Sequence, residues 1–336
     1  MEIRPFSCDY SDLLELVRRA WPAEHKGYLD YTEKDLEDVF QAPDTDPRLT
    51  LGAYRNGKLV AFLLSKRKRL AIHGREYLGL FNTLASTHPD HAHLFPYLRL
   101  KERCIEKAVD RGYRLNFGFV AEGIKNGSIE SLYARRKGFH CCRVHSFSSL
   151  MAPETEDGPS PPLRDASESL DGLTIRPFRE SDTDRCLEIV REAVARCPVH
   201  EKWDRASFLH HFIRRAGSFA RVVEREGRVE ALAGCLGAVM NYRRFQRKVR
   251  IFYDLFLDRL TEAQKQGVFG LVADQSKREE SDGIAVPNTG YFHTGFLERM
   301  GYQSLPFRSY QTHLLVTFFG DPVELGPRDP FYLEIL

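Results

Sequence analysis

The order of apolar and polar positions predicts the same kind of domain twice along the chain. In the first half, apolar residues at Leu13, Leu14, Leu16 and Val17 fall on one face of a helix. Alternating or continuous apolar segments bounded by Gly, Asn and Pro predict the strands and helices that follow. The expected elements are strand 2–6, this first helix, helix 33–40, strands 49–55, 58–69 and 76–86, helix 97–111, strand 115–120, helix 129–137 and strand 140–151.

The second half repeats this order. Antiparallel strands joined by short turns are followed by a strand, a helix and another strand, and this combination predicts one mixed, twisted sheet in each half. The fold class is therefore α/β in the sense of an α+β mixed sheet. The expected elements are strand 173–178, helices 181–196 and 204–215, strands 218–225, 229–241 and 248–258, helix 262–280, strand 283–287, helix 290–300 and strand 305–318.

Short sequence landmarks recur in both halves in the same order. Recurrence of this kind is typical of an internal duplication. The matched pairs are Ile3-Arg4-Pro5-Phe6 with Ile175-Arg176-Pro177-Phe178, Leu14-Glu15-Leu16-Val17 with Leu187-Glu188-Ile189-Val190, Arg55-Asn56-Gly57-Lys58 with Arg225-Glu226-Gly227-Arg228, and Lys137-Gly138-Phe139 with Met300-Gly301-Tyr302.

A polar segment at 153–172, rich in proline and glycine, separates the two halves. It carries too few large apolar side chains to bury a core, so we expect a linker there. The predicted organisation is an N-terminal domain at 1–152, the linker, a C-terminal domain at 173–318 and a tail at 319–336. The tail ends in the apolar run Phe331–Leu336, which is expected either to add an edge strand or to cover an interface.

The composition fits a soluble two-domain protein. Of the 336 residues, 42% are apolar and 29% are charged, which is enough for two ordinary cores. The net charge of +2 provides no overall field for nucleic acid or membrane binding. With no long apolar span, no signal peptide and seven scattered cysteines, we expect a cytoplasmic location, reduced thiols and no membrane partner; the oligomeric state stays open.

Three of these segments together resemble the GNAT family of acyltransferases. They are the opening Ile-Arg-Pro-Phe before a helix cap, the segment from Asn126 through Leu132-Tyr133 to Phe139, and Tyr253-Asp254-Leu255-Phe256-Leu257-Asp258. In tandem they look like two-domain bacterial members such as mycothiol synthase. The resemblance implies two acyl-CoA N-acyltransferase folds and a donor that is acetyl-CoA or another acyl-CoA.

In this family, a loop before the main helix directs its N–H groups at the diphosphate and needs small residues. The corresponding stretch of the first half, His88–Tyr97, contains bulky side chains and Pro96. We therefore expect this half to be a scaffold without cofactor; the alternative is that it holds an acyl group in an unusual way. Its histidines His88, His91 and His93 are expected to be solvated and not to bind a metal, because no fourth ligand is evident.

The second half matches the family's loop in part, with Gln264 and Gly267 at the expected spacing but Phe269 in place of a small residue. A plain amphipathic helix is the alternative interpretation. If the resemblance holds, the candidate cofactor-binding residues are Gln264, Lys265, Gln266, Gly267, Val268, Phe269 and Gly270, together with Phe256 and Leu257 at the end of the preceding strand.

Acyl transfer to an amine requires removal of an ammonium proton and protonation of the departing thiolate. Asp254, on the strand before the candidate loop, is the candidate base, and Tyr291 is the candidate acid. Both have structural alternatives, since a strand carboxylate can be satisfied by neighbours and a tyrosine often serves packing.

Both halves carry basic residues at the same expected hairpin. The first has Lys66-Arg67-Lys68-Arg69, and the second has Arg243, Arg244, Arg247, Lys248 and Arg250. Such a run usually forms a solvated strand edge. Alternatively, it binds an anionic partner such as an acyl carrier protein or tRNA.

The leading hypothesis is an enzyme that transfers an acetyl or other acyl group from acyl-CoA to a small-molecule amine, with its active site in the C-terminal half. Two alternatives remain. One is a non-catalytic binding or regulatory module that keeps the fold. The other is an acyltransferase whose donor is carried on tRNA or on a carrier protein.

Overall fold

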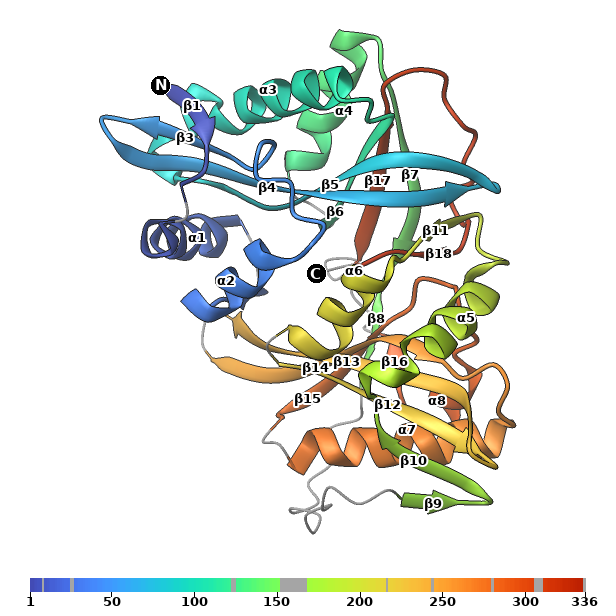
Figure 1. Ribbon diagram of the computed structural model, residues 1–336. Helices are drawn as coiled ribbons and strands as arrows, with labels where there is room; N and C mark the ends of the chain where they lie inside the picture. Colours follow the sequence, from blue (N-terminus) through green and yellow to red (C-terminus); the bar gives the residue numbers. More distant parts are fainter. Residues whose placement is uncertain are drawn as a thin grey trace. The chain divides into compact units, whose positions relative to one another are not determined.

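A computed structural model describes residues 1–7, 9–24, 27–121, 125–151, 168–215, 217–242, 245–278, 281–304 and 311–334. The chain forms two compact units (Figure 1). Unit 1 comprises Met1–Ser146, Pro198–Lys202 and Gln311–Leu336, and unit 2 comprises Phe147–Cys197 and Trp203–Tyr310. Most of the expected linker lies outside the described residues.

Unit 1 is built mainly from the first half of the chain. Its elements are β1 (Glu2–Pro5), α1 (Tyr10–Glu24), β2 (Gly27–Asp30), α2 (Glu33–Gln41), β3 (Leu51–Arg55), β4 (Lys58–Ile72), β5 (Arg75–Thr87), the 3-10 helix η1 (Pro89–Leu94), α3 (Pro96–Asp110), β6 (Leu115–Ala121), α4 (Lys125–Lys137), β7 (His140–Phe147), β11 (Val199–Glu201), β17 (Thr312–Phe318) and β18 (Phe331–Tyr332).

Unit 2 contains β8 (Ser149–Met151), β9 (Glu168–Leu170), β10 (Leu173–Pro177), the 3-10 helix η2 (Glu180–Asp182), α5 (Thr183–Val194), α6 (Arg205–Leu209), a π-helical turn η3 (His210–Arg214), β12 (Ser218–Arg225), β13 (Arg228–Tyr242), β14 (Gln246–Phe256), α7 (Glu262–Arg278), β15 (Gly283–Pro287), α8 (Gly295–Arg299) and β16 (Gln303–Ser304).

Each unit has one mixed sheet, which confirms the predicted fold class. In unit 1 the strand order is β1-β3-β4-β5-β6-β17-β7, with β11 beside β4 and β18 beside β11. In unit 2 the order is β16-β8-β15-β14-β13-β12-β10-β9. The pairs β5–β6 and β14–β15 are parallel, and the long hairpins before them are antiparallel. This is the arrangement that the strand-helix-strand pattern predicted.

The last strand of each half differs from the prediction. The single strand expected at 140–151 is divided into β7 in the first sheet and β8 in the second, where β8 pairs with β15. In turn, β17, from the end of the second half, pairs along its whole length with β6 of unit 1. Alternating apolar residues show that a segment is a strand, but they do not determine which of two similar sheets it joins.

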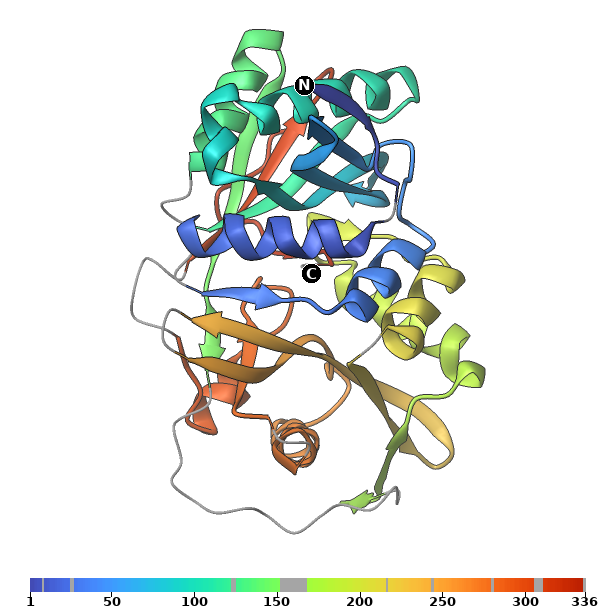
Figure 2. The ribbon, with the colours of Figure 1, turned by 90° about the vertical axis from the view of Figure 1, so that its left-hand side faces the viewer.

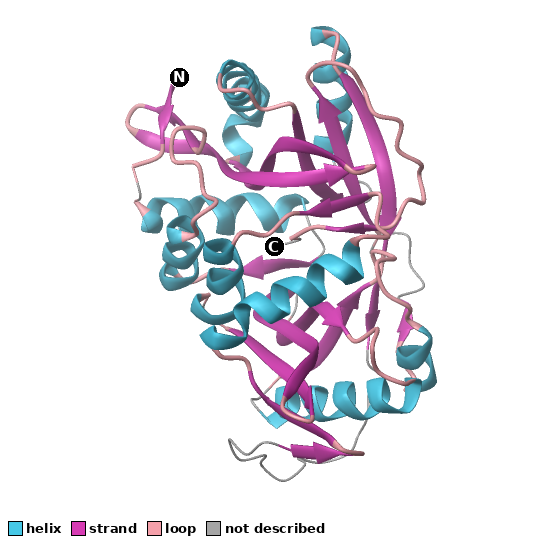
Figure 3. Ribbon diagram, turned by 45° about the vertical axis from the view of Figure 1, so that its right-hand side comes forward, coloured by secondary structure: helices cyan, strands magenta, loops and turns pink. Residues whose placement is uncertain are grey.

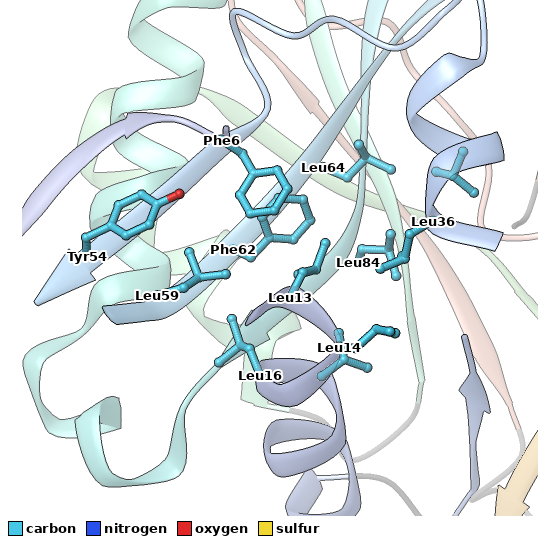
Figure 4. Packing of buried hydrophobic residues seen from close by; sticks show 12 residues of the cluster. Phe6, Leu13, Leu14, Leu16, Leu36, Tyr54, Leu59, Phe62, Leu64 and Leu84 are labelled. Atoms are coloured by element: carbon cyan, nitrogen blue, oxygen red, sulfur yellow. The ribbon is translucent and has the colours of Figure 1, made fainter. Parts of the chain in front are cut away.

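Helices cover both faces of the sheet of unit 1. Helix α1 runs along one face, as Figure 2 shows, and packs there with α2. The apolar cluster beneath these helices contains Phe6, Leu13, Phe62 and Leu84 (Figure 4). Helix α3 packs on the opposite face through Leu100 and its neighbours. Strands β5 and β6 are neighbours at the centre of this sheet.

Candidate functional site

Strands β5 and β6 of unit 1 pair over a short stretch and then diverge. The parallel register ends at Phe81 opposite Phe117, although β5 continues to Thr87 and β6 to Ala121. Beyond this point Ala85 is half-buried. A strand edge that leaves its neighbour can pair its N–H and C=O groups with an extended ligand. We call the segments 82–87 and 118–121 the β5/β6 divergence.

A β-bulge lies within the β5/β6 divergence. The register between β4 and β5 shifts so that Leu84 and Ala85 together stand opposite Leu63. Leu84 has a φ of 51°, in the left-handed region that a leucine rarely adopts. Bulges take backbone groups out of the strand ladder and occur often beside active sites. This local geometry was not evident from the apolar pattern of the strand.

Basic side chains gather at the loop that precedes α3. Arg19 Nη1 lies 3.4 Å from His88 Nε2, and Arg55 Nη1 lies 3.4 Å from His91 Nδ1. The pKa of His91 is lowered, first by partial desolvation and then by the positive charges of His88 and Arg55. Arg19 also pairs with Glu15, with Nη2 and Oε1 2.7 Å apart, so part of this positive charge is compensated. The remaining basic side chains favour an anionic group over a cation.

The bulky residue that argued against a cofactor in this loop does not point into the fold. Phe95 adopts a left-handed conformation with a φ of 50°, and 63% of its surface is exposed. It forms the cap between η1 and α3, and Pro96 occupies the first turn of α3. A proline is well tolerated there, because the first helical N–H groups have no partner within the helix.

A buried polar network lies on the α3 side of the β5/β6 divergence. Lys101 Nζ donates to Asn82 Oδ1 at 2.8 Å and to Glu130 Oε1 at 2.9 Å. The same carboxylate oxygen accepts a hydrogen bond from the Tyr97 hydroxyl at 2.9 Å. The network therefore connects β5, α3 and α4. Since these partners compensate the buried charges, the network fixes Asn82 where β5 leaves β6.

The equivalent strand edge in unit 2 is occupied by a side chain of the protein. The register of β14 and β15 ends at Ile251 opposite Ala285. Just beyond it, the buried Tyr291 hydroxyl donates to the carbonyl of Tyr253 at 2.6 Å and accepts from the N–H of Leu255 at 2.7 Å. Burial, and next the charge of Asp254, raises the pKa of Tyr291. The phenol is therefore neutral, and its hydroxyl is hydrogen-bonded to the backbone groups of β14 with which an extended ligand would otherwise pair.

Phe269, the residue that departs from the family's loop, is part of the core of unit 2. Its ring is fully buried, at 0% exposure, and packs against Phe252 of β14, Phe296 of α8 and Tyr302, with ring centroids 5.3 to 5.9 Å apart. Helix α7 runs beside the sheet of unit 2 (Figure 3), and these ring contacts hold it there. Phe269 thus fills the space beside β14 with an aromatic ring.

The other predicted loop residues belong to the first turns of α7. Gln264 and Thr261 cap this helix reciprocally, with N···O distances of 3.1 and 3.3 Å. Lys265 Nζ pairs with Glu262 at 2.8 Å. A Cβ placed on Gly267 would lie 2.3 Å from Leu170 Cδ2, so Leu170 covers this glycine. Val268, Phe256 and Leu257 are buried, and Gln266 and Gly270 are half-buried.

Asp254 has a partner that sequence reasoning missed. Its Oδ2 lies 2.8 Å from His211 Nε2, and both side chains are buried. The histidine ring packs against Trp203 at 4.8 Å. His211 belongs to the π-helical turn η3, where Arg215 N–H bonds to the carbonyl of His210. Such turns occur frequently at functional sites, but no local sequence pattern predicted this one.

The predicted basic hairpin of the first half is only partly solvated. Arg67 and Arg69 are exposed, but Lys66 and Lys68 are buried on the other face of β4. Lys66 Nζ lies 2.8 Å from Glu334 Oε1. The expectation of a solvated edge is therefore wrong for the two lysines, because alternate residues of a strand point to opposite faces. Arg243 and Arg244 lie outside the described residues.

Lys68 is the centre of this buried cluster. Its Nζ lies 2.5 Å from Asp44, 2.7 Å from Glu201 and 2.5 Å from Glu334. Burial alone would lower its pKa, but the three carboxylates outweigh burial and raise it. The three acids are close enough together to hold a metal ion. The ammonium group already serves as their shared cation, so we interpret the cluster as an ion-pair network.

Each sheet has a parallel pair that diverges beside a bulge or register shift. This arrangement is consistent with two acyl-CoA N-acyltransferase (GNAT) folds in tandem. No protein-family model and no curated protein sequence matches the chain. Solved structures do. Saccharomyces cerevisiae N-myristoyltransferase with bound myristoyl-CoA superposes with a TM-score of 0.72 at 13% identity, covering 98% of this chain and 82% of that chain.

A second structure of the yeast enzyme, with myristoyl-CoA and inhibitors, has a TM-score of 0.72 at 14% identity over 94% of this chain and 79% of that chain. A GCN5-related N-acetyltransferase from Anabaena variabilis has a TM-score of 0.55 at 9% identity, and the match covers 94% of this chain and 72% of that chain. At these identities the likeness concerns the fold. Every described helix is too short or too polar to cross a membrane.

Proposed function

We propose that the chain is an acyl-CoA-dependent N-acyltransferase whose donor lies along β5, in the β5/β6 divergence. The observation that carries this proposal is the contrast between the two units. In unit 1 the strands diverge at a bulge, Ala85 is half-buried, and its carbonyl accepts a long hydrogen bond of 3.3 Å from Trp21 Nε1 of α1. In unit 2 the corresponding edge of β14 is already bonded to the Tyr291 hydroxyl. This location departs from the C-terminal half that the sequence favoured.

The residues of unit 1 suit the parts of an acyl-CoA. Arg19 and Arg55, beside the loop before α3, supply positive charge for phosphate groups without a glycine-rich loop. The edge of β5 offers backbone groups to the amides of the pantetheine arm. The N–H groups at the Leu84 bulge are suited to stabilise the oxyanion that forms at the thioester carbonyl.

In this proposal the acceptor amine attacks the thioester carbonyl carbon and the carbon–sulfur bond breaks. The nitrogen loses one proton as the amide forms, and the thiolate takes up one proton and leaves as the thiol of CoA. The chain contributes positioning and stabilisation of the oxyanion, which are large parts of such a catalysis. With the donor in unit 1, Asp254 and Tyr291 take no part in the proposed transfer. They stay the candidate base and acid of the alternative predicted from the sequence, in which the donor lies in unit 2 and Asp254 is paired with His211. A small-molecule amine remains the proposed acceptor. An acyl carrier protein or tRNA as donor carrier would contact the exposed Arg67 and Arg69.

Acetyl-CoA is expected to raise the thermal midpoint of the full chain. A ligand that binds only the folded state at about 100 times its dissociation constant adds about 2.7 kcal/mol to stability. Differential scanning fluorimetry with acetyl-CoA and with free CoA measures this shift. An unchanged midpoint with both ligands at millimolar concentration contradicts the proposal. It would favour the non-catalytic module or, if tRNA or acyl carrier protein shifts the midpoint instead, a carrier-bound donor.

Two matched substitutions locate the donor. Ala85→Trp places a bulky ring beside the β5/β6 divergence, and Ala285→Trp does the same at the end of the β14/β15 pairing in unit 2. We expect Ala85→Trp to weaken acetyl-CoA binding about tenfold or more, measured by calorimetry, and Ala285→Trp to change it about twofold or less. Circular dichroism verifies that both variants fold. The reverse order of effects would place the donor in unit 2, as the sequence suggested.

A further inference from the structure

The point where β5 and β6 separate is packed with side chains on both faces of the sheet. We infer that the acyl group of the donor is short, such as acetyl or butyryl, and that Phe331 of the tail is the residue that sets this limit. The inference rests on the proposed function, because it concerns the acyl end of a donor bound along β5. It assigns a specificity-determining role to a residue far from β5 in the sequence.

Aromatic rings fill one face at this point. Phe81 and Phe117, the last paired residues, stack with ring centroids 5.1 Å apart. Phe119, the next residue of β6 on that face, lies edge-on to Phe81 at 5.8 Å and stacks on Phe331 at 5.9 Å. Phe81, Phe117 and Phe331 are at most 1% exposed. A long acyl chain entering on this face would have to displace a ring.

The opposite face is unsuitable for a long acyl chain for a different reason. There Asn82, Lys101 and Glu130 form the hydrogen-bonded network that connects β5 to α3 and α4. A hydrocarbon chain among these groups would break bonds to buried charges without replacing them, and this is strongly unfavourable. Among the side chains that the structure describes, neither face therefore offers a long apolar path from the thioester.

The tail holds Phe331 in place from two sides. Strand β18 pairs with β11, with Phe331 opposite Val199. Three residues later, Glu334 binds Lys66 and Lys68 in the buried ion cluster. Lys66 is the direct cross-strand neighbour of Phe81 on β4. The ring is thus fixed beside the end of the β5–β6 pairing by strand pairing and by charge, and it is not a loosely attached cover.

The test measures binding of free CoA and of acetyl-, butyryl-, octanoyl- and myristoyl-CoA to the full chain by equilibrium dialysis, below the concentrations at which the long thioesters form micelles. We expect acetyl- and butyryl-CoA to bind about as tightly as free CoA, and octanoyl- and myristoyl-CoA to bind about tenfold or more weakly. Phe331→Ala should restore octanoyl-CoA binding about tenfold, and the milder Phe331→Leu should do so in part.

Phe318→Ala serves as the matched control, since Phe318 is an equally buried phenylalanine at the far end of β17. It should leave the order of the donors unchanged. Tighter binding of myristoyl-CoA than of acetyl-CoA by the unmodified chain would overturn the inference while leaving the proposed function intact. Absence of binding by free CoA and by every thioester would instead overturn the proposed function itself. Equal gains from Phe331→Ala and Phe318→Ala would remove the specific role of Phe331.

Discussion

Replacing Lys68 by methionine should lower the free energy of unfolding of unit 1 by about 3–5 kcal/mol, the usual cost of removing one member of a buried ion network. Methionine has a similar length but no charge. The substitution would leave Asp44, Glu201 and Glu334 together in a buried site without the ammonium group that all three contact. Glu201 belongs to β11 and Glu334 to the tail, so both of these segments should be destabilised along with the β4–β5 hairpin that carries Lys68.

Urea denaturation followed by tryptophan fluorescence measures this effect. The chain has two tryptophans, Trp21 in unit 1 and Trp203 in unit 2, so a Trp203→Phe background reports on unit 1 alone. Arg69→Met is the control, because Arg69 is an exposed cation on the same strand and should cost less than about 1 kcal/mol. Similar losses of stability from Lys68→Met and Arg69→Met would show that the buried ion cluster contributes no more to stability than an exposed cation does.

Replacing Phe269 by alanine should destabilise unit 2 by about 3–5 kcal/mol, the usual range for a buried phenylalanine. The ring lies at the junction of α7, α8 and β14, where it contacts Phe252, Phe296 and Tyr302. Its removal leaves a cavity that these neighbours can close only in part. The expected result is therefore loss of stability without gain of acyl-CoA binding.

Fluorescence of Trp203 in a Trp21→Phe background measures the change, and Phe245→Ala provides the control because Phe245 is 52% exposed. Acyl-CoA binding is measured on the same protein. If Phe269→Ala costs little stability and tightens acyl-CoA binding, the space beside β14 is a blocked cofactor site, and the C-terminal location predicted from the sequence is the better one.

Local regularities were enough to predict the tandem architecture. The repeated Ile-Arg-Pro-Phe openings became β1 and β10, and the expected meanders became β3–β5 and β12–β14. Turn residues and apolar periodicity determine local structure over a few residues, so they can be recognised in a single sequence. The helix expected at 290–300 was reduced to Gly295–Arg299, and the end strands joined different sheets from those their position in the sequence suggested.

The candidate site was harder to predict because its chemistry depends on groups that are distant in the sequence. The loop motif directed attention to Gly267, but Leu170 covers that glycine and Phe269 is a core residue. Nothing in the segment around Tyr291 shows that its hydroxyl bonds to the backbone of β14. The divergence of β5 from β6 is likewise a property of two paired strands.

By itself, then, the sequence determined the mixed sheet of each half and indicated an internal repeat, because these follow from the local spacing of apolar, glycine and proline residues. The family that the chain resembles was suggested by a few matching segments. Only the tertiary structure decided that Lys66 and Lys68 are buried with Glu334, and that Phe331 packs where β5 and β6 separate. Burial and charge compensation depend on which remote segments meet, and this is settled by packing of the whole chain.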